Sequence, residues 1–153
     1  MTLIIYYSKY GSTRDYAEWL AEATGAKLMP LAEAKKLDIA AYDTIAFGCP
    51  FYMFRLKIAG FVKSRAGQLK GKRVAFFAVG GAEPDNPQDR SGYENALPEE
   101  IRAGMRFFYL RGRMVVARMG FFDRTMMRMA KTADYDYTDR STIAPLVEFL
   151  KGQ

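Results

Sequence analysis

The sequence contains no histidine and only one cysteine, Cys49. Histidine is the commonest general base and metal ligand of enzymes, so its absence excludes Ser-His-Asp triads, Cys-His pairs and His/Cys zinc sites. A single cysteine excludes an intrachain disulfide, which favours a reducing, cytoplasmic location. We identify no catalytic side chain and expect no metal. Chemistry performed by this chain is therefore expected to depend on an imported cofactor.

Long hydrophobic runs and excess acidic charge are also missing. No stretch approaches the roughly 18 apolar residues of a membrane span, and the chain enters a predicted strand directly, leaving no room for a signal peptide. Its 153 residues are expected to form one domain, 1–153. The formal net charge is +6 and the pI about 9.4, which predicts an anionic partner. No nucleic-acid-binding motif is present, so we expect a carboxylated substrate, an acidic protein or a membrane surface instead.

Apolar runs alternate with amphipathic segments along the chain, a pattern typical of α/β proteins. The predicted strands are residues 2–7, 27–31, 44–48, 73–79 and 107–110. The predicted helices are residues 12–24, 57–66, 97–105 and 143–151, and residues 82–95 are predicted to be a polar loop. Strands and helices that alternate with short connections predict a doubly wound parallel sheet.

The turn after the first strand combines hydroxyl groups, glycine and the start of a helix. Backbone N–H groups and the helix dipole at such a turn attract a phosphate, and side-chain hydroxyls complete its hydrogen bonds. An ordinary turn capped by Ser12 or Thr13 is the alternative. The candidate phosphate-binding residues are Ser8, Lys9, Tyr10, Gly11, Ser12 and Thr13.

This turn resembles the FMN-phosphate loop of flavodoxins, Ser/Thr-x-Thr-Gly-x-Thr, through Ser8, Gly11 and Thr13. Tyr10 replaces a threonine of that pattern, which removes one small hydroxyl. The resemblance implies a flavodoxin-like five-stranded parallel sheet of order 2-1-3-4-5, with FMN at the carboxyl ends of strands 1 and 3. The sequence contains neither Gly-x4-Gly-Lys-Ser/Thr nor Gly-x-Gly-x-x-Gly, so P-loop and dinucleotide-binding folds are not expected.

The loop after the third strand, 48–55, resembles the Gly-Ser-Pro-Ile-Tyr-x-Gly loop of many flavodoxin-domain proteins. The matching residues are Gly48, Pro50 and Tyr52, whereas Phe54 replaces a glycine. The resemblance implies contact with the isoalloxazine ring, and the same is expected of the glycine turn after the fourth strand. Ordinary packing is the alternative for both loops. The candidate ring-binding residues are Cys49, Pro50, Phe51, Tyr52, Met53, Phe54, Val79, Gly80, Gly81 and Ala82.

Cys49 and Arg55 also match the Cys-x5-Arg signature of tyrosine phosphatases. That chemistry needs a thiolate surrounded by successive backbone N–H groups. Pro50 removes the first of these donors, bulky residues fill the rest of the loop, and the motif follows the third strand instead of the first. We therefore do not expect phosphatase activity.

A basic, methionine-rich helical insert, about residues 113–138, separates the fifth strand from the last helix. One interpretation is a helix that packs on the core and exposes a basic face. The other is a mobile cap that offers arginines and methionines to an anionic, apolar ligand or to a membrane surface. The candidate substrate- or partner-binding residues are Arg111, Arg113, Arg118 and Arg124.

The segment 121–124, the methionines that follow it and Gly112 resemble the same region of the menaquinone-dependent protoporphyrinogen oxidases. The resemblance implies an FMN-dependent oxidoreductase that passes electrons to a quinone. Its expected partner is a redox partner, a quinone or a small anionic substrate. Two alternatives stay open. The chain can be an electron carrier with no substrate of its own, or a flavin-free module that binds a partner or the periphery of a membrane.

Overall fold

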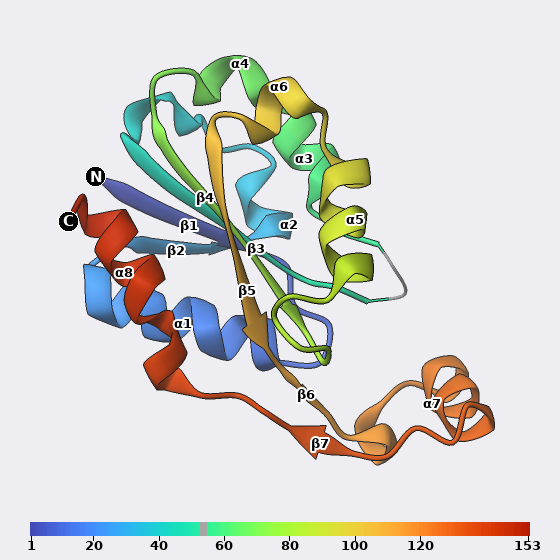
Figure 1. Ribbon diagram of the computed structural model, residues 1–153. Coiled ribbons are helices and arrows are strands. Elements are labelled where there is room, and N and C mark those ends of the chain that lie inside the picture. Colours follow the sequence, from blue (N-terminus) through green and yellow to red (C-terminus); the bar gives the residue numbers. More distant parts are fainter. Residues whose placement is uncertain (53–54) are drawn as a thin grey trace.

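A computed structural model of the chain describes residues 1–52 and 55–153. Its centre is a five-stranded parallel sheet of order β2-β1-β3-β4-β5, which confirms the flavodoxin-like strand order (Figure 1). The strands are β1 (Thr2–Tyr6), β2 (Lys27–Pro30), β3 (Thr44–Pro50), β4 (Arg73–Gly80) and β5 (Met105–Arg111).

The three central strands read as continuous apolar runs because helices cover both faces of the sheet. Leu3, Ile4 and Ile5 of β1 are fully buried, and six of the seven residues of β3 are buried as well. Gly48 lies opposite Phe77 of β4, and a Cβ at this position would lie 2.1 Å from the Phe77 ring. The glycine therefore makes room for a buried ring at the point where β3 approaches the loops.

Two layers of helices enclose the sheet (Figure 1). One layer is α1 (Ser12–Thr24) and α8 (Ala144–Lys151), which pack on Ile4, Ala46 and Phe77. Short helices cover the opposite face, where the larger core cluster lies. They are α2 (Leu31–Ala34), α3 (Ala59–Ser64), α4 (Ala66–Leu69), α5 (Pro87–Ala96) and α6 (Glu99–Arg102), with the 3-10 turn η1 (Ile39–Ala41). Within the described ranges, no helix is long and apolar enough to span a bilayer.

The predicted polar loop 82–95 is wrong, because most of it forms α5. Asn86 caps this helix by accepting hydrogen bonds from the N–H groups of Gln88 and Asp89, and Pro87 occupies its first turn. Tyr93 anchors α5 in the core. The helix predicted over 97–105 is reduced to α6, and the one predicted over 57–66 is reduced to α3 and the start of α4.

The insert leaves the sheet at its carboxyl edge and extends away from the domain (Figure 1). It consists of β6 (Arg113–Met114), the turn η2 (Val116–Arg118), helix α7 (Phe121–Met129) and β7 (Tyr135–Asp136), and the turn η3 (Arg140–Ile143) leads into α8. β6 and β7 pair antiparallel as a short ribbon. Met114, Val116 and Met119 form a small separate core beneath α7.

Candidate functional site

The loop between β1 and α1 lies at the carboxyl ends of the central strands. The Tyr7 N–H donates to the Gly48 carbonyl of β3 at 2.9 Å. Gly11 has φ +100°, a conformation that only glycine adopts without strain, and its N–H donates to Ser8 Oγ at 3.1 Å. Helix α1 then begins at Ser12, and its capping residue is Gly11, without a side-chain cap. The predicted cap by Ser12 or Thr13 is therefore wrong, because both residues lie inside the first turn.

The first turn of α1 contains hydrogen-bonding groups without partners. In the part of the chain that the structure describes, the N–H groups of Ser12, Thr13 and Arg14 make no hydrogen bond. The Thr13 hydroxyl is likewise buried and unpaired, and Thr13 is only 1% exposed. Unpaired donors at a helix start attract an anion, and a buried hydroxyl without a partner is costly. The loop therefore fits a phosphate group that would satisfy these atoms.

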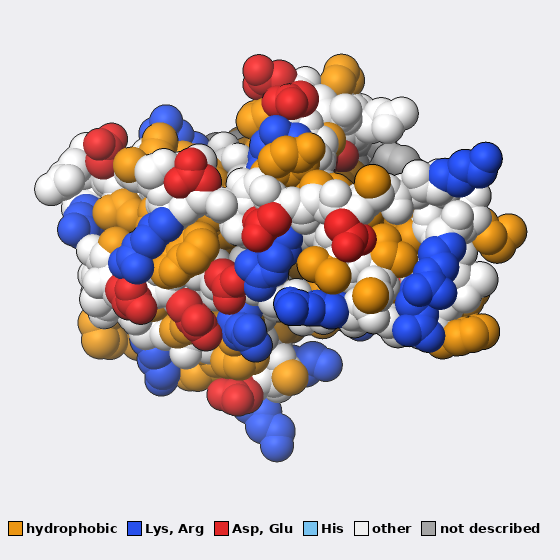
Figure 2. Space-filling view, turned by 90° about the horizontal axis from the view of Figure 1, so that it is seen from below, with side chains coloured by type: hydrophobic (Ala, Val, Ile, Leu, Met, Phe, Trp, Pro, Cys, Tyr) orange, Lys and Arg blue, Asp and Glu red, His pale blue; other side chains and the backbone are white. Residues whose placement is uncertain are grey.

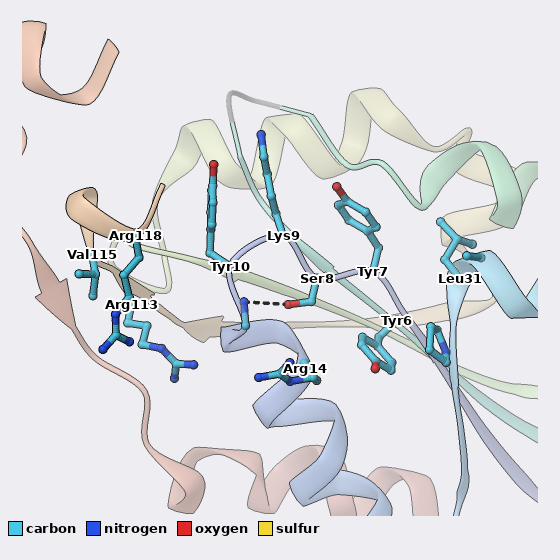
Figure 3. A pocket seen from close by; sticks show the side chains of 13 residues that line it. Tyr6, Tyr7, Ser8, Lys9, Tyr10, Arg14, Leu31, Arg113, Val115 and Arg118 are labelled. Carbon is cyan, nitrogen blue, oxygen red and sulfur yellow. Dashed lines mark hydrogen bonds between the residues drawn. The ribbon is translucent and has the colours of Figure 1, made fainter. Parts of the chain in front are cut away.

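Three arginines line a cavity of about 610 Å³ beside this loop (Figure 3). Arg14 comes from α1, whereas Arg113 and Arg118 come from the insert and lie on the opposite side of the loop from Tyr6 and Leu31. Arg113 pairs with Asp15 at 2.6 Å. Its guanidinium lies so close to Gly11 that a Cβ there would be 3.1 Å from Nη2. Two of the four predicted partner arginines, Arg113 and Arg118, thus line the cavity beside this loop.

A buried carboxylate of the insert joins two of the predicted loops. Asp123 of α7 is 8% exposed, its Oδ2 lies 2.6 Å from Lys9 Nζ, and the Tyr10 hydroxyl donates to it. Tyr52, from the loop after β3, has its hydroxyl beside the same carboxylate, and Lys9 Nζ lies 4.7 Å from the centre of the Tyr52 ring. The insert is therefore anchored to the phosphate loop and to the loop after β3 through one side chain.

The electrostatics of this cluster favour a charged Asp123. Burial raises the pKa of its carboxyl group, but the ion pair with Lys9, the hydrogen bond from Tyr10 and the nearby Tyr52 hydroxyl outweigh burial and hold the pKa below its ordinary value. The hydrogen bond to Asp123 raises the pKa of Lys9. Burial, followed by the hydrogen bond to Asp123, raises the pKa of Tyr10. Lys9 and Asp123 are thus an ion pair at neutral pH. No sequence motif indicated a role for Asp123, although it is the only acidic residue between positions 111 and 133.

A second cavity, of about 1360 Å³, opens on the other side of the phosphate loop. Tyr7 and Lys9 line both cavities, so this loop separates them. The second cavity reaches from the loop after β3 to α5 and α7. Its lining includes Pro50, Tyr52 and Leu56, the insert residues Phe122, Asp123 and Met126, and the cations Arg55, Lys57 and Lys63. The cavity combines an apolar and aromatic wall with positive charge.

The sequence matches the family described as flavodoxin domain over residues 3–141. The chain belongs to the flavodoxin domain family. This membership agrees with the strand order and with the phosphate-loop pattern from which the family was predicted. Membership of this family supports FMN as the cofactor. No curated protein matches the chain.

Several solved structures resemble this flavodoxin domain at low sequence identity. The Trp repressor binding protein of Bacillus subtilis is 20% identical, with a TM-score of 0.55 and coverage of 73% of this chain and 83% of its own. A WrbA-like flavodoxin of Agrobacterium tumefaciens is 20% identical, with a TM-score of 0.54 and coverage of 97% and 98%. A flavoprotein of Lactobacillus acidophilus NCFM, solved in complex with FMN, is 17% identical, with a TM-score of 0.52 and coverage of 72% and 91%. At these identities the likeness establishes the fold.

The second predicted ring loop of this flavodoxin domain, 79–82, is packed by the chain's own tyrosines. A Cβ at Gly80 would lie 2.3 Å from the Tyr109 hydroxyl, and one at Gly81 would lie 2.0 Å from the Tyr135 hydroxyl. The Ala82 N–H donates to the Tyr109 hydroxyl at 3.2 Å. We expected the flavin ring to approach these glycines closely, but the side chains of Tyr109 and Tyr135 occupy that space. Neither cavity is lined by this loop.

Arg111 and Arg124 lie apart from both cavity linings. Arg111 donates to the Gly81 carbonyl at 3.3 Å and its guanidinium covers the Tyr137 ring at 3.6 Å, so it braces the loop after β4. Arg124 is half-buried on α7. Of the four arginines predicted to bind a substrate or partner, Arg111 and Arg124 thus lie away from the cavity that Arg113 and Arg118 line.

The remaining predicted residues have packing roles. Cys49 is fully buried, and burial raises the pKa of its thiol to about 11, which rules out a phosphatase nucleophile. A Cβ at Gly92 of α5 would lie 2.2 Å from the Phe51 ring, so Phe51 packs on that helix. Val79 belongs to the core of the sheet. Met53 and Phe54 were also predicted to contact the ring and lie outside the described residues.

Proposed function

We propose that this flavodoxin-domain protein binds FMN and uses it as an oxidoreductase, transferring electrons from a donor to a quinone or another small acceptor. The observation that carries the proposal is the buried, unpaired Thr13 hydroxyl beside the unpaired N–H groups of the first turn of α1. A phosphate satisfies all of these groups at once. When bound, FMN supplies the electron or hydride transfer that a chain without histidine lacks.

In this proposal the chain's own residues bind and neutralise the phosphate. The N–H groups of Ser12, Thr13 and Arg14 donate to it, and Ser8 holds the loop open by accepting from Gly11. Arg14 and Arg113 place positive charge beside the loop. Tyr10 does not replace the missing threonine hydroxyl, because its own hydroxyl is engaged by Asp123.

The second cavity supports an enzyme with its own substrate over a simple electron carrier. A carrier needs only an accessible cofactor edge, whereas here the insert closes one side of a large cavity with Phe122, Asp123 and Met126. The apolar wall suits a quinone, and Arg55, Lys57 and Lys63 suit a carboxylated molecule. The resemblance of the insert to the menaquinone-dependent protoporphyrinogen oxidases makes protoporphyrinogen, which carries carboxylates, the first electron donor to test.

Titration of the purified protein with FMN, FAD and riboflavin, followed by flavin fluorescence, tests the cofactor. We expect FMN to bind at least about 100-fold more tightly than riboflavin, since riboflavin lacks the phosphate that the loop would bind. Thr13→Val is expected to weaken FMN binding about 10-fold. Thr24→Val is the matched control, because Thr24 lies at the other end of α1, where its hydroxyl donates to the Leu20 carbonyl at 2.7 Å. Equal affinity for FMN and riboflavin, or no effect of Thr13→Val, would refute this placement of the phosphate.

Reoxidation of the reduced, FMN-loaded protein separates the remaining alternatives. An enzyme with an acceptor site is expected to show a rate that saturates with a short-chain menaquinone analogue. An electron carrier is expected to react with proteins such as cytochrome c and to show no saturation with the quinone. A protein that binds no flavin under any condition would be a partner- or membrane-binding module, and the proposal would fail.

A further inference from the structure

Helix α7 has its polarity reversed for a helix at the surface of a protein. Surface helices normally bury their apolar side chains and expose charged ones. In α7 the residue Asp123 faces the protein and is 8% exposed, whereas Phe121, Phe122 and Met129 are 78%, 72% and 79% exposed. We call these three side chains the outer face of α7. They are three of the five large hydrophobic side chains exposed in the described part of the chain.

The outer face is surrounded by positive charge. Residues 111–133 contain six basic residues and a single acidic residue, Asp123, whose charge is already paired with Lys9. Arg128 is exposed one position before Met129, and Lys131 is exposed just after the helix. Lys and Arg side chains gather with hydrophobic ones at one end of the molecule (Figure 2). The insert carries this end away from the sheet (Figure 1).

We propose that the outer face of α7 binds the surface of an anionic lipid bilayer. A short helix with aromatic and aliphatic residues on one side and Arg and Lys beside them lies in the headgroup region, with its apolar side chains inserted and its cations against lipid phosphates. No helix in the described residues spans a bilayer, so α7 would lie in the interface. Arg111 and Arg113 have acidic partners, Glu83 and Asp15, whereas Arg128 and Lys131 form no ion pair with any described residue. This uncompensated charge beside the outer face selects anionic lipid.

A second copy of the chain is a poorer occupant of this face. A two-fold contact would bring the same Arg128 and Lys131 together from both copies, and like charges repel. The outer face also consists of three side chains, which is far less than the roughly 800 Å² that each partner contributes to a stable protein interface. Insertion into lipid needs no such area, since each apolar side chain gains free energy separately.

Docking would also orient the second cavity. Phe122 and Met126 line that cavity, and Phe122 belongs to the outer face of α7. The cavity mouth would therefore lie at the lipid surface, where an apolar molecule dissolved in the bilayer could enter it. This consequence depends on the proposed redox function, whereas lipid binding itself does not.

Co-sedimentation of the purified full chain with phosphatidylcholine vesicles, with and without phosphatidylglycerol, tests the proposal. We expect binding to the anionic vesicles that weakens as salt is added. Arg128→Gln/Lys131→Gln is expected to lower the partition coefficient about 30-fold, given about 1 kcal/mol for each cation near an anionic surface. The charge-matched control is Lys36→Gln/Lys70→Gln, because these exposed lysines lie outside the insert. Phe121→Ser/Met129→Ser is expected to lower binding at least about 10-fold without lowering the melting temperature, since both side chains are exposed.

A Phe121→Trp variant reports insertion directly. The parent chain has one tryptophan, Trp19 of α1, whose emission is expected not to change on adding vesicles, whereas Trp at position 121 is expected to shift to the blue. The proposal is overturned if the parent chain fails to bind anionic vesicles, or if both double variants bind as well as their parent. It is also overturned if size-exclusion chromatography shows a dimer that Phe121→Ser/Met129→Ser dissociates, since a second copy would then occupy the face.

Discussion

The anchor of the insert can be tested by removing the charge of Asp123. The Asp123→Asn variant keeps the shape of the side chain but weakens the hydrogen bond from Tyr10 and removes the ion pair with Lys9. The Lys9 side chain is 38% exposed, so solvent screens this pair and we assign it little free energy. The hydrogen bond from the Tyr10 hydroxyl to the buried carboxylate accounts for the main loss, about 2 kcal/mol.

This loss is expected to appear as local opening of α7, because the helix is attached to the domain at few points. Hydrogen exchange of the α7 amides, followed by mass spectrometry, is expected to be about 30-fold faster in the variant at neutral pH. The charge-matched control is Asp85→Asn, at an exposed position in the loop before α5. The folded pKa of Asp123 is depressed, so its contribution is present above the ordinary value of 3.8 and is lost as pH falls through the folded pKa. The difference between variant and parent should therefore shrink in acid. Equal exchange at neutral pH would refute the anchoring role.

Three further outcomes follow from the packing and charge described above. Cys49 is expected to resist a thiol reagent at mildly alkaline pH in the folded protein and to react fully in denaturant, because its thiol is buried and its pKa is raised to about 11. Gly48→Ala is expected to lower the free energy of unfolding by about 2 kcal/mol in a urea titration, since its Cβ would overlap the buried Phe77 ring. Arg113→Gln is expected to weaken FMN binding about 10-fold, because its guanidinium lies beside the phosphate loop; equal effects on FMN and riboflavin would contradict this role.

Most of the sheet could be predicted from sequence because its strands are buried on both faces. Continuous apolar runs such as 44–48 and 73–79 have no competing helical period, and both became central strands. The α5 region was missed for the opposite reason. It has few apolar residues and contains Gly92, so its helical signal lay in Asn86 and Pro87 at the start and not in hydrophobic periodicity.

The strand, turn and helix start of the candidate phosphate loop were predictable because they are local features. Ser8 and Gly11 lie in the turn and Thr13 lies in the first turn of α1, so their position depends on no distant residue. The role of Asp123 was not predictable in this way. Its partners Lys9 and Tyr10 lie more than a hundred positions earlier, and an acidic residue within a basic helix looks like an ordinary exposed charge until the fold brings these segments together.

The Tyr16 hydroxyl of α1 forms hydrogen bonds with the chain at both ends of the insert. It donates to the Arg111 carbonyl at 2.6 Å, where the chain leaves the sheet, and accepts from the Asp139 N–H at 3.0 Å, where the chain returns. Because entry and exit meet at one buried point, the free energy of closing this excursion depends only weakly on its length. The length of the insert between these ends can therefore change at little cost in closure free energy. Arg113 and Asp123 contact the phosphate loop, so a change that moves either residue also changes the candidate cofactor site.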